Sequence, residues 1–324
     1  MTEFLFLLFK LSGLWLLLVA LSVALATAAY GPYQRLLAAA DPALRAACRL
    51  AYGLMPLLVA SFVVLLVTRP TLAGLLVPDH CHGIACEAHV PVLEGGSWAS
   101  SALAAFGGLT LMAGMFGLTA LTLHALGRLR ILRRLTRLTD SAGTYRVVDS
   151  NGTLACCIGL WRPQILVSQG VLDALDAQEF EAVLAHERAH AMRRDNLQAF
   201  ILHSATRFWP AGIRERLRED HAADTEQACD RVAERVTGSR DTVASAIRTL
   251  AATLPEQGLD RAVAFGSGNL SQRLAALQQP QNTGHQMMHA IAGVMALVIA
   301  GAALTGALTG FSHWFMEWLV AAGW

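Results

Sequence analysis

Four long stretches without Asp, Glu, Lys or Arg constrain this sequence more than any other feature. A helix needs about 20 mostly apolar residues to cross a bilayer, and each stretch approaches or exceeds that length. The composition agrees, because 54% of the 324 residues are hydrophobic and only 15% are charged. The sequence therefore predicts a mainly α-helical integral membrane protein with four transmembrane helices, at residues 11–30, 50–68, 98–126 and 286–315.

The charged residues gather in one part of the chain. Residues 127–284 hold most of the Arg, Asp and Glu, and this segment is long enough to bury a core of its own. We expect a region of three transmembrane helices at 1–126 with an external loop at 69–97. A soluble domain at 127–284 follows, inserted between the third and fourth spans. Residues 285–324 form the fourth span and a short tail.

Arginines in the connections predict the orientation, since Lys and Arg accumulate on the cytoplasmic side. The connection at 31–49 has three Arg, the loop at 69–97 has one at its edge, and residues 128–137 have five. We therefore expect both termini outside and the soluble domain in the cytoplasm. Topology and anionic lipid headgroups account for this basic segment. The expected partner is thus the lipid bilayer, and direct nucleic-acid binding is not expected.

The soluble domain has the pattern of an α+β fold. Residues 145–168 are rich in Val, Ile, Leu and Cys and broken by turn residues, which predicts a few short strands. Asp176 followed by Glu179 has the pattern of a capping box, and the helix it opens is expected to run to about His203. Further helices are expected at residues 213–236, 242–253 and 271–277.

A metal-binding pattern lies on the first of these helices. His186 and His190 are four residues apart, so their side chains lie one turn apart on the same face, where two imidazoles can ligate one Zn²⁺. Glu187 lies beside the metal, where a general base can take a proton from water. This five-residue pattern is common by chance, so its setting matters for the interpretation.

A catalytic zinc needs a third protein ligand and one open position. Glu226 on the second expected helix is the best candidate, and Asp230 lies four residues later on the same face. A carboxylate such as Asp230 commonly accepts the free N–H of a ligating histidine. The alternative is a solvated acidic face that Arg231 and Arg235 balance. The histidine pair on the upstream helix favours the ligand interpretation.

Several segments of the soluble domain match one known pattern, at residues 162–168, 179–190, 194–196, 208–210 and 224–230. Together they resemble the peptidase domain of the BlaR/MecR antibiotic-sensor family, which also has three spans, a peptidase domain and a fourth span. The resemblance covers residues 145–277 in motif. It implies a gluzincin-type fold with one catalytic Zn²⁺, with His186, His190 and Glu226 as ligands and Glu187 as base.

Two further features of the domain bear on catalysis. Arg273 falls where related peptidases often keep an Arg near the active site, although it could instead cap a helix or pair with an acid. A protein substrate is expected to lie extended beside the strand edge around residues 156–166, by adding a strand to the sheet.

The resemblance implies a membrane zinc endopeptidase of the bacterial cytoplasmic membrane. Its function would be signal-induced cleavage of a cytoplasmic protein, such as a winged-helix transcriptional repressor. One alternative is a quality-control protease like the membrane heat-shock metalloproteases, and another is a signalling receptor whose peptidase fold only binds a partner. The family carries a penicillin-binding sensor after the fourth span, where this sequence continues only from 311 to 324. We therefore do not expect direct acylation by β-lactams.

The external loop has a cluster of metal-binding side chains, namely His80, Cys81, His82, Cys86 and His89. Imidazole and thiolate donors could bind copper or zinc. In an oxidising compartment, Cys81 and Cys86 could instead form a disulfide. Both interpretations stay open, and either is compatible with a loop that receives the inducing signal.

Overall fold

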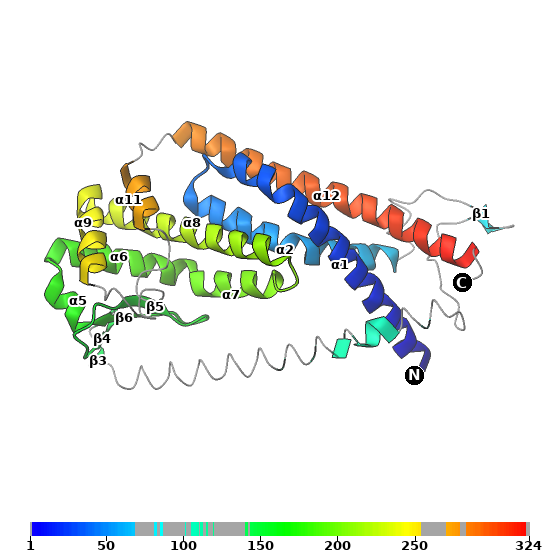
Figure 1. Ribbon diagram of the computed structural model, residues 1–324, viewed down its shortest axis with the longest axis horizontal. Coiled ribbons are helices and arrows are strands. Elements are labelled where there is room, and N and C mark those ends of the chain that lie inside the picture. The colour runs from blue at the N-terminus through cyan, green and yellow to red at the C-terminus, as the bar shows by residue number, and fades with distance from the viewer. Residues whose placement is uncertain are drawn as a thin grey trace. The chain divides into compact units, whose positions relative to one another are not determined.

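The part of the chain that the structure describes is mainly helical, and its strands form one small sheet and one short hairpin (Figure 1). The computed structural model describes residues 2–68, 81–82, 85–86, 140–141, 143–253, 270–278 and 283–321, with a few short pieces between 101 and 119. The helices are α1 (Thr2–Leu37), α2 (Pro42–Val67), α5 (Gln169–Ala174), α6 (Ala177–Arg193), α7 (Asp195–Ala205), α8 (Ala211–Thr237), α9 (Arg240–Thr253), α11 (Leu270–Gln278) and α12 (Thr283–Ala321). The strands are β1 (Cys81–His82), β2 (Ala85–Cys86), β3 (Asp140–Ser141), β4 (Arg146–Val148), β5 (Ala155–Ile158) and β6 (Gln164–Ser168).

Among the described residues, three helices are long and apolar enough to cross a membrane. The spans cover Leu7–Leu37, Pro42–Val67 and Gly284–Phe315. They coincide with the first, second and fourth predicted spans, while the third, at 98–126, lies for the most part outside the described residues. The expected connection at 31–49 is shorter than predicted. Only residues 38–41 separate α1 from α2, because the helices continue past the apolar stretches into the arginine-containing segments.

The chain divides into two compact units. The first comprises residues 1–34, 51–123 and 293–324, which include most of α1, α2 and α12. Within it the Tyr52 hydroxyl on α2 donates a hydrogen bond to the Ala26 carbonyl on α1, and the Trp15 indole donates to Ser61. These interhelical bonds satisfy polar groups that would otherwise face an apolar environment. Many large apolar side chains of these helices are exposed, as expected of surfaces that face lipid.

The second unit comprises residues 35–50 and 124–292 and contains a four-stranded sheet. The strand order is β3-β4-β6-β5, with β4 and β6 parallel and the other pairs antiparallel. The Leu154 carbonyl accepts a hydrogen bond from the Ser168 backbone N–H. This bond fixes which residues of β5 direct their backbone groups toward β6. Since backbone groups alternate in direction along a strand, those of Ala155 and Cys157 point away from β6. Among the described strands, β5 is therefore an edge strand with an outward-facing row of backbone groups.

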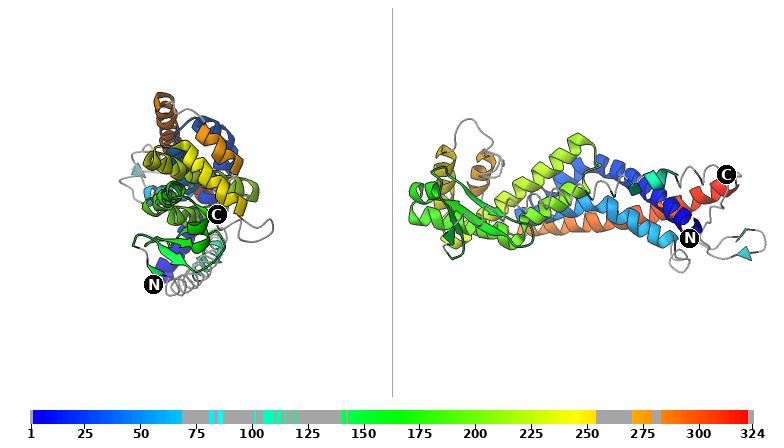
Figure 2. Two further views of the ribbon diagram at one scale, coloured as in Figure 1. Left: turned by 90° about the vertical axis from the view of Figure 1, so that its left-hand side faces the viewer. Right: turned by 90° about the horizontal axis from the view of Figure 1, so that it is seen from below.

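Helix α6 is buried on two sides, between the sheet and the other helices of the unit. It contacts β5, α8 and α9, and Figure 2 shows the sheet and α6 from two further directions. One apolar cluster joins it to the sheet, α5 and α9 through Val183 and Leu184. A second cluster joins it to α8, α9 and α11 through Ala182 and Ala185, whose small side chains allow close helix packing. This double burial explains why polar side chains on α6 lie inside the domain.

The helix expected to run from Asp176 to about His203 is in fact two helices. The Asp176 capping box is present, with Asp176 accepting from the Glu179 N–H and Glu179 accepting from the Asp176 N–H. However, α6 ends at Arg193, and Arg194 adopts a left-handed conformation with φ 54° before α7 begins. The prediction of one helix was wrong because apolar spacing continues across the corner and no Gly or Pro marks it. The other predicted helices correspond to α8, α9 and α11, and α8 ends at Gly238 in the left-handed region.

The external loop is described only in part. Strands β1 and β2 pair antiparallel, with Cys81 opposite Cys86 and His82 opposite Ala85. His80 and His89 lie outside the described residues, as do the side chains of the paired strands. The choice between a metal site and a disulfide in this loop therefore stays a prediction.

Candidate metal centre

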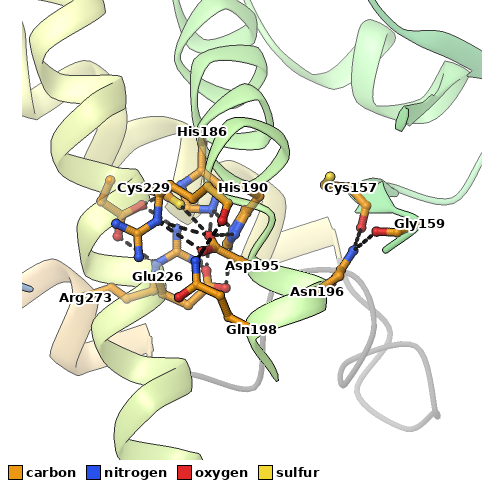
Figure 3. A network of polar contacts seen from close by, with 12 residues as sticks. Cys157, Gly159, His186, His190, Asp195, Asn196, Gln198, Glu226, Cys229 and Arg273 are labelled. Carbon is orange, nitrogen blue, oxygen red and sulfur yellow. Dashed lines mark hydrogen bonds and ion pairs between the residues drawn. The ribbon is translucent and has the colours of Figure 1, made fainter. Parts of the chain in front are cut away.

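The two histidines of α6 and a glutamate of α8 converge on one point (Figure 3). The Nε2 atoms of His186 and His190 are 3.1 Å apart. The Glu226 carboxylate lies 3.4 Å from the His186 Nε2 and 3.5 Å from the His190 Nε2. One ligand atom from each of these side chains lies within 4.8 Å of the others. The structure thus brings together the three residues predicted as ligands.

The donor set fits a tetrahedral metal ion. Ligand atoms about 2.0–2.2 Å from one zinc at tetrahedral angles are about 3.3 Å from each other, close to the spacing of these atoms. Burial alone would lower the pKa of His186, but the carboxylates of Asp230 and Glu226 outweigh it and raise the pKa to about 10. The surroundings of this imidazole therefore favour positive charge, which is what a cation-binding site requires.

Each histidine of the pair is oriented by a carboxylate on its other ring nitrogen. The His186 Nδ1 lies 2.9 Å from Asp230 on α8, and the His190 Nδ1 lies 2.9 Å from Asp195 at the start of α7. A carboxylate at Nδ1 fixes the tautomer so that the Nε2 lone pair points toward the metal position. The corner at Arg194 makes the second contact possible, since it turns Asp195 back toward the end of α6.

Arg273 on α11 completes a buried charge network. Its Nε and Nη2 donate to Asp230 at 2.8 and 2.6 Å, and its Nη1 lies 3.0 Å from Glu226. Burial alone would raise the pKa values of both carboxyl groups, but hydrogen bonding and charge from His186 and Arg273 hold them below the usual range. The structure therefore supports the interpretation that Arg273 pairs with acids rather than capping a helix. The acids with which it pairs are those of the candidate metal centre.

Glu187 is buried beside the metal ligands, with 5% of its surface exposed. Burial raises its pKa, although the charges of His186 and His190 act in the opposite direction. A carboxylate with a raised pKa suits general base work, because it can take a proton near neutral pH and return it later.

Strand β5 lies next to α6 and is held at its end by α7. The Asn196 side-chain amide donates to the Cys157 carbonyl at 2.8 Å and to the Gly159 carbonyl at 3.3 Å (Figure 3). Burial and the charge of Glu187 raise the pKa values of the Cys156 and Cys157 thiols to about 12. These thiols therefore stay neutral, and the strand adds no charge beside Glu187.

Three residues of this network were not predicted to have a role in the site. Asp195, Asn196 and Cys229 entered only as parts of the matching segments at 194–196 and 224–230. Cys229 is buried, with its Sγ 3.6 Å from an Asp195 oxygen. The available signal for Asp195 was a carboxylate five residues after His190, but its contact depends on the turn at Arg194. Spacing along one helix cannot reveal such a turn.

The fold and the donor set define a metallopeptidase with a histidine pair on α6 and a glutamate on α8. The comparison with protein families agrees, because residues 130–277 match the family model described as BlaR1 peptidase M56. This segment is thus a peptidase domain of the M56 type, and the resemblance noted in the sequence is confirmed. No curated protein and no solved structure gives a significant match to the chain.

Proposed function

We propose that this protein is a membrane-embedded zinc endopeptidase that cleaves a cytoplasmic protein, such as a transcriptional repressor, in response to a signal. The convergence of His186, His190 and Glu226 in an M56 peptidase domain carries the proposal. The BlaR1 description of the family favours regulated cleavage over general protein turnover. The family description names neither the target nor the signal for this chain. Experiments such as those below are needed to identify both.

The chemistry follows from the roles of the site residues. His186, His190 and Glu226 would hold zinc, which would supply a Lewis acid that polarises the scissile carbonyl and lowers the pKa of water. Glu187 takes the proton from the attacking water and returns it to the leaving amine. Asp230 and Asp195 keep the two imidazoles oriented. Arg273 balances the negative charge of Glu226 and Asp230, so that these two carboxylates can lie together inside the domain.

The substrate lies extended along the outer edge of β5. The sequence suggested an edge somewhere within residues 156–166, and the strand order supports β5 within that range, because β6 lies between β4 and β5. Of the two strands β5 and β6, only β5 lies at an edge of the sheet, and it is next to the helix that carries Glu187. A peptide added to this edge would form backbone hydrogen bonds, which bind a chain with little dependence on its sequence.

Four transmembrane helices hold this domain at the cytoplasmic side of a bacterial inner membrane. The three apolar helices and the uncharged stretch at 98–126 support this number. An even number of spans leaves both termini on the same side. The arginines at 31–49 and 128–137 support an external position for the termini and a cytoplasmic position for residues 127–284. Labelling of single cysteines from one side of the membrane tests this arrangement.

Glu187→Gln tests the proposed chemistry. The amide keeps the shape of the side chain but cannot accept the proton. Cleavage of β-casein by the purified full-length protein in detergent should therefore fall by about 10²–10⁴-fold, while the zinc content stays at that of the wild type. Glu181→Gln is the matched control, since Glu181 is exposed on the same helix. Cleavage by Glu187→Gln at the wild-type rate would refute the peptidase mechanism.

The regulatory part of the proposal has a separate test in cells. Chromosomal Glu187→Gln and wild-type strains are compared for the abundance and new N-termini of all proteins under inducing conditions. We expect one or a few cytoplasmic proteins to stay intact in the variant. Stabilisation of many membrane proteins would instead indicate quality control and would contradict the regulatory role.

A further inference from the structure

Helix α8 is aligned with the start of α2 by three contacts, all of them within the second unit. The contacts join Arg231 to Asp41 at 2.7 Å, Arg45 to Asp224 at 2.7 Å, and Arg49 to the Asp220 carbonyl at 3.1 Å. Moving from residue 41 to residue 49 therefore corresponds to moving from residue 231 back to residue 220. The two segments run antiparallel, and the order of the contacts gives the direction of α8.

This direction leads toward the bilayer. The charge-free stretch of α2 starts directly after Arg49, and α2 continues through it as one helix to Val67. Following α8 from Asp220 back to its first residue, Ala211, continues in the direction in which α2 enters the membrane. At a rise of 1.5 Å per residue, Ala211 lies about 14 Å beyond Asp220 along the axis of α8. The corner between α7 and α8, at residues 206–210, is thus directed at the lipid surface.

The α7–α8 corner holds an aromatic ring outward (Figure 1). Phe208 is 75% exposed, whereas the adjacent Trp209 is 3% exposed and packs inside. The Trp209 N–H donates to the Thr206 carbonyl at 3.1 Å, and the Thr206 hydroxyl accepts from the Arg218 Nε at 2.9 Å. These bonds fix the corner, so the outward position of Phe208 follows from its structure. An aromatic ring beside arginines is typical of protein segments that lie at the membrane interface.

Basic side chains surround Phe208 in the sequence, and two of them are available to a ligand. Residues 206–219 include four Arg and two Glu. Arg214 and Arg218 donate hydrogen bonds within the corner. Within the described part of the chain, the exposed side chains of Arg207 and Arg216 have no hydrogen bond or ion pair. Arg216 precedes Asp220 by four residues, so it lies on the face of α8 that contacts the start of α2.

We propose that the α7–α8 corner binds the anionic phospholipid surface beside α2, with Phe208 at the boundary between headgroups and acyl chains and with Arg207 and Arg216 on lipid phosphates. Guanidinium groups form strong, charge-assisted hydrogen bonds with phosphate oxygens. The inference depends on α2 crossing the bilayer but not on peptidase activity. Since α8 also carries Glu226, this contact fixes the distance between the candidate metal centre and the membrane.

Photocrosslinking from position 208 tests whether the corner meets lipid. The full-length protein is reconstituted in nanodiscs of phosphatidylcholine and phosphatidylglycerol, with p-benzoylphenylalanine in place of Phe208. We expect crosslinks to phospholipid, identified by mass spectrometry. Val236 is the matched control position, because it is also exposed but lies near the other end of α8, which the same alignment directs away from the bilayer. No lipid crosslink from position 208, or equal yields from both positions, would overturn the inference.

Removal of charge tests whether anionic headgroups are the partner. In Arg207→Gln/Arg216→Gln, the yield of lipid crosslinks from position 208 should fall about 5-fold or more, since each arginine near an anionic surface contributes about a factor of 5 to binding. Arg235→Gln/Arg248→Gln should keep the unmodified yield, because it removes two exposed arginines outside the corner. Nanodiscs of phosphatidylcholine alone should also lower the yield, and they leave the sequence unchanged, so misfolding cannot explain that result. An unchanged yield in either the corner variant or phosphatidylcholine alone would contradict the inference.

Discussion

At the scale of single residues, the metal centre depends on side chains that do not touch the metal position. Asp230 and Asp195 come from different helices, and each binds the Nδ1 of one histidine. Asp195 also accepts from Arg193 at 3.1 Å and from Gln198 at 3.3 Å, and it is buried. A carboxylate fixed in this way makes the imidazole a better ligand than an uncharged partner would.

Asp195→Asn should therefore weaken zinc binding without removing a ligand. The amide keeps the size of the side chain but loses the charge that supports His190, so we expect zinc affinity to fall by about 10- to 100-fold. Competition with a chromogenic chelator measures it on the detergent-solubilised protein. Asp173→Asn, at an exposed position on α5, is the control. Equal zinc affinity of Asp195→Asn and wild type would show that Asp195 has no such role.

Prediction from sequence worked for residues whose positions depend on one helix. His186 with His190, and Glu226 with Asp230, share a helical face because each pair is four residues apart. Asp195 and Asn196 could not be found in this way, because the left-handed Arg194 redirects the chain between His190 and both residues. A non-glycine residue adopts that conformation only when its surroundings stabilise it, and a local pattern does not contain those surroundings.

At the scale of secondary structure elements, α8 is held by two arginines in the first turns of α2. Arg45 donates to Asp224 at 2.7 Å and to Gln227 at 2.6 Å, and Arg49 also pairs with Asp224. Residues 35–50 belong to the same compact unit as α8. The arginines that predicted membrane orientation thus also contact the helix that carries Glu226. The sequence indicated the first of these roles only, because the second requires residues that are 179 positions apart.

Asp224→Ala should destabilise the domain strongly, since it leaves two guanidinium groups without their buried partner. Loss of one member of a buried ion pair costs about 3–5 kcal/mol. Arg45→Ala should cost less, because Arg49 still pairs with Asp224. Urea unfolding, followed by tryptophan fluorescence, gives both free energies.

The double variant completes a cycle whose coupling energy should lie between about 0.5 and 3 kcal/mol. The exposed pair Arg214–Glu215 serves as the control, and its loss should cost about 0–1 kcal/mol. If Asp224→Ala cost no more than Arg214→Ala, the proposed role of the buried pair would be wrong.

At the scale of the whole molecule, composition was sufficient to predict the positions of the apolar helices but not the order of strands in the sheet. Spans at three of the four predicted positions are long apolar helices, because length and the lack of charge are enough to recognise them. The strand order β3-β4-β6-β5 could not be read from residues 145–168, since short strands of similar composition can pair in several orders. The strand at the edge of the sheet could therefore not be identified from the sequence.

The proposed topology predicts a specific labelling pattern. In a cysteine-free variant, single cysteines at Thr2, Gly95 and Gly323 should react with a membrane-impermeant maleimide added to intact spheroplasts. A cysteine at Glu181 should react only after the membrane is opened, because it lies in the soluble domain. Labelling of the cysteine that replaces Glu181 in intact spheroplasts would indicate the opposite orientation. Labelling of only one of the cysteines that replace Thr2 and Gly323 would contradict an even number of spans.

The free edge of β5 also affects how safely this protein can accumulate. An unpaired strand edge is a template on which other chains can aggregate, and proteins commonly protect such edges by making them short or covering them. Strand β5 has four residues, and Asn196 occupies two of the carbonyls along its outer side. Few groups remain for an unwanted strand from a second copy. The same side chain thus helps to protect this edge of the sheet against pairing with other chains.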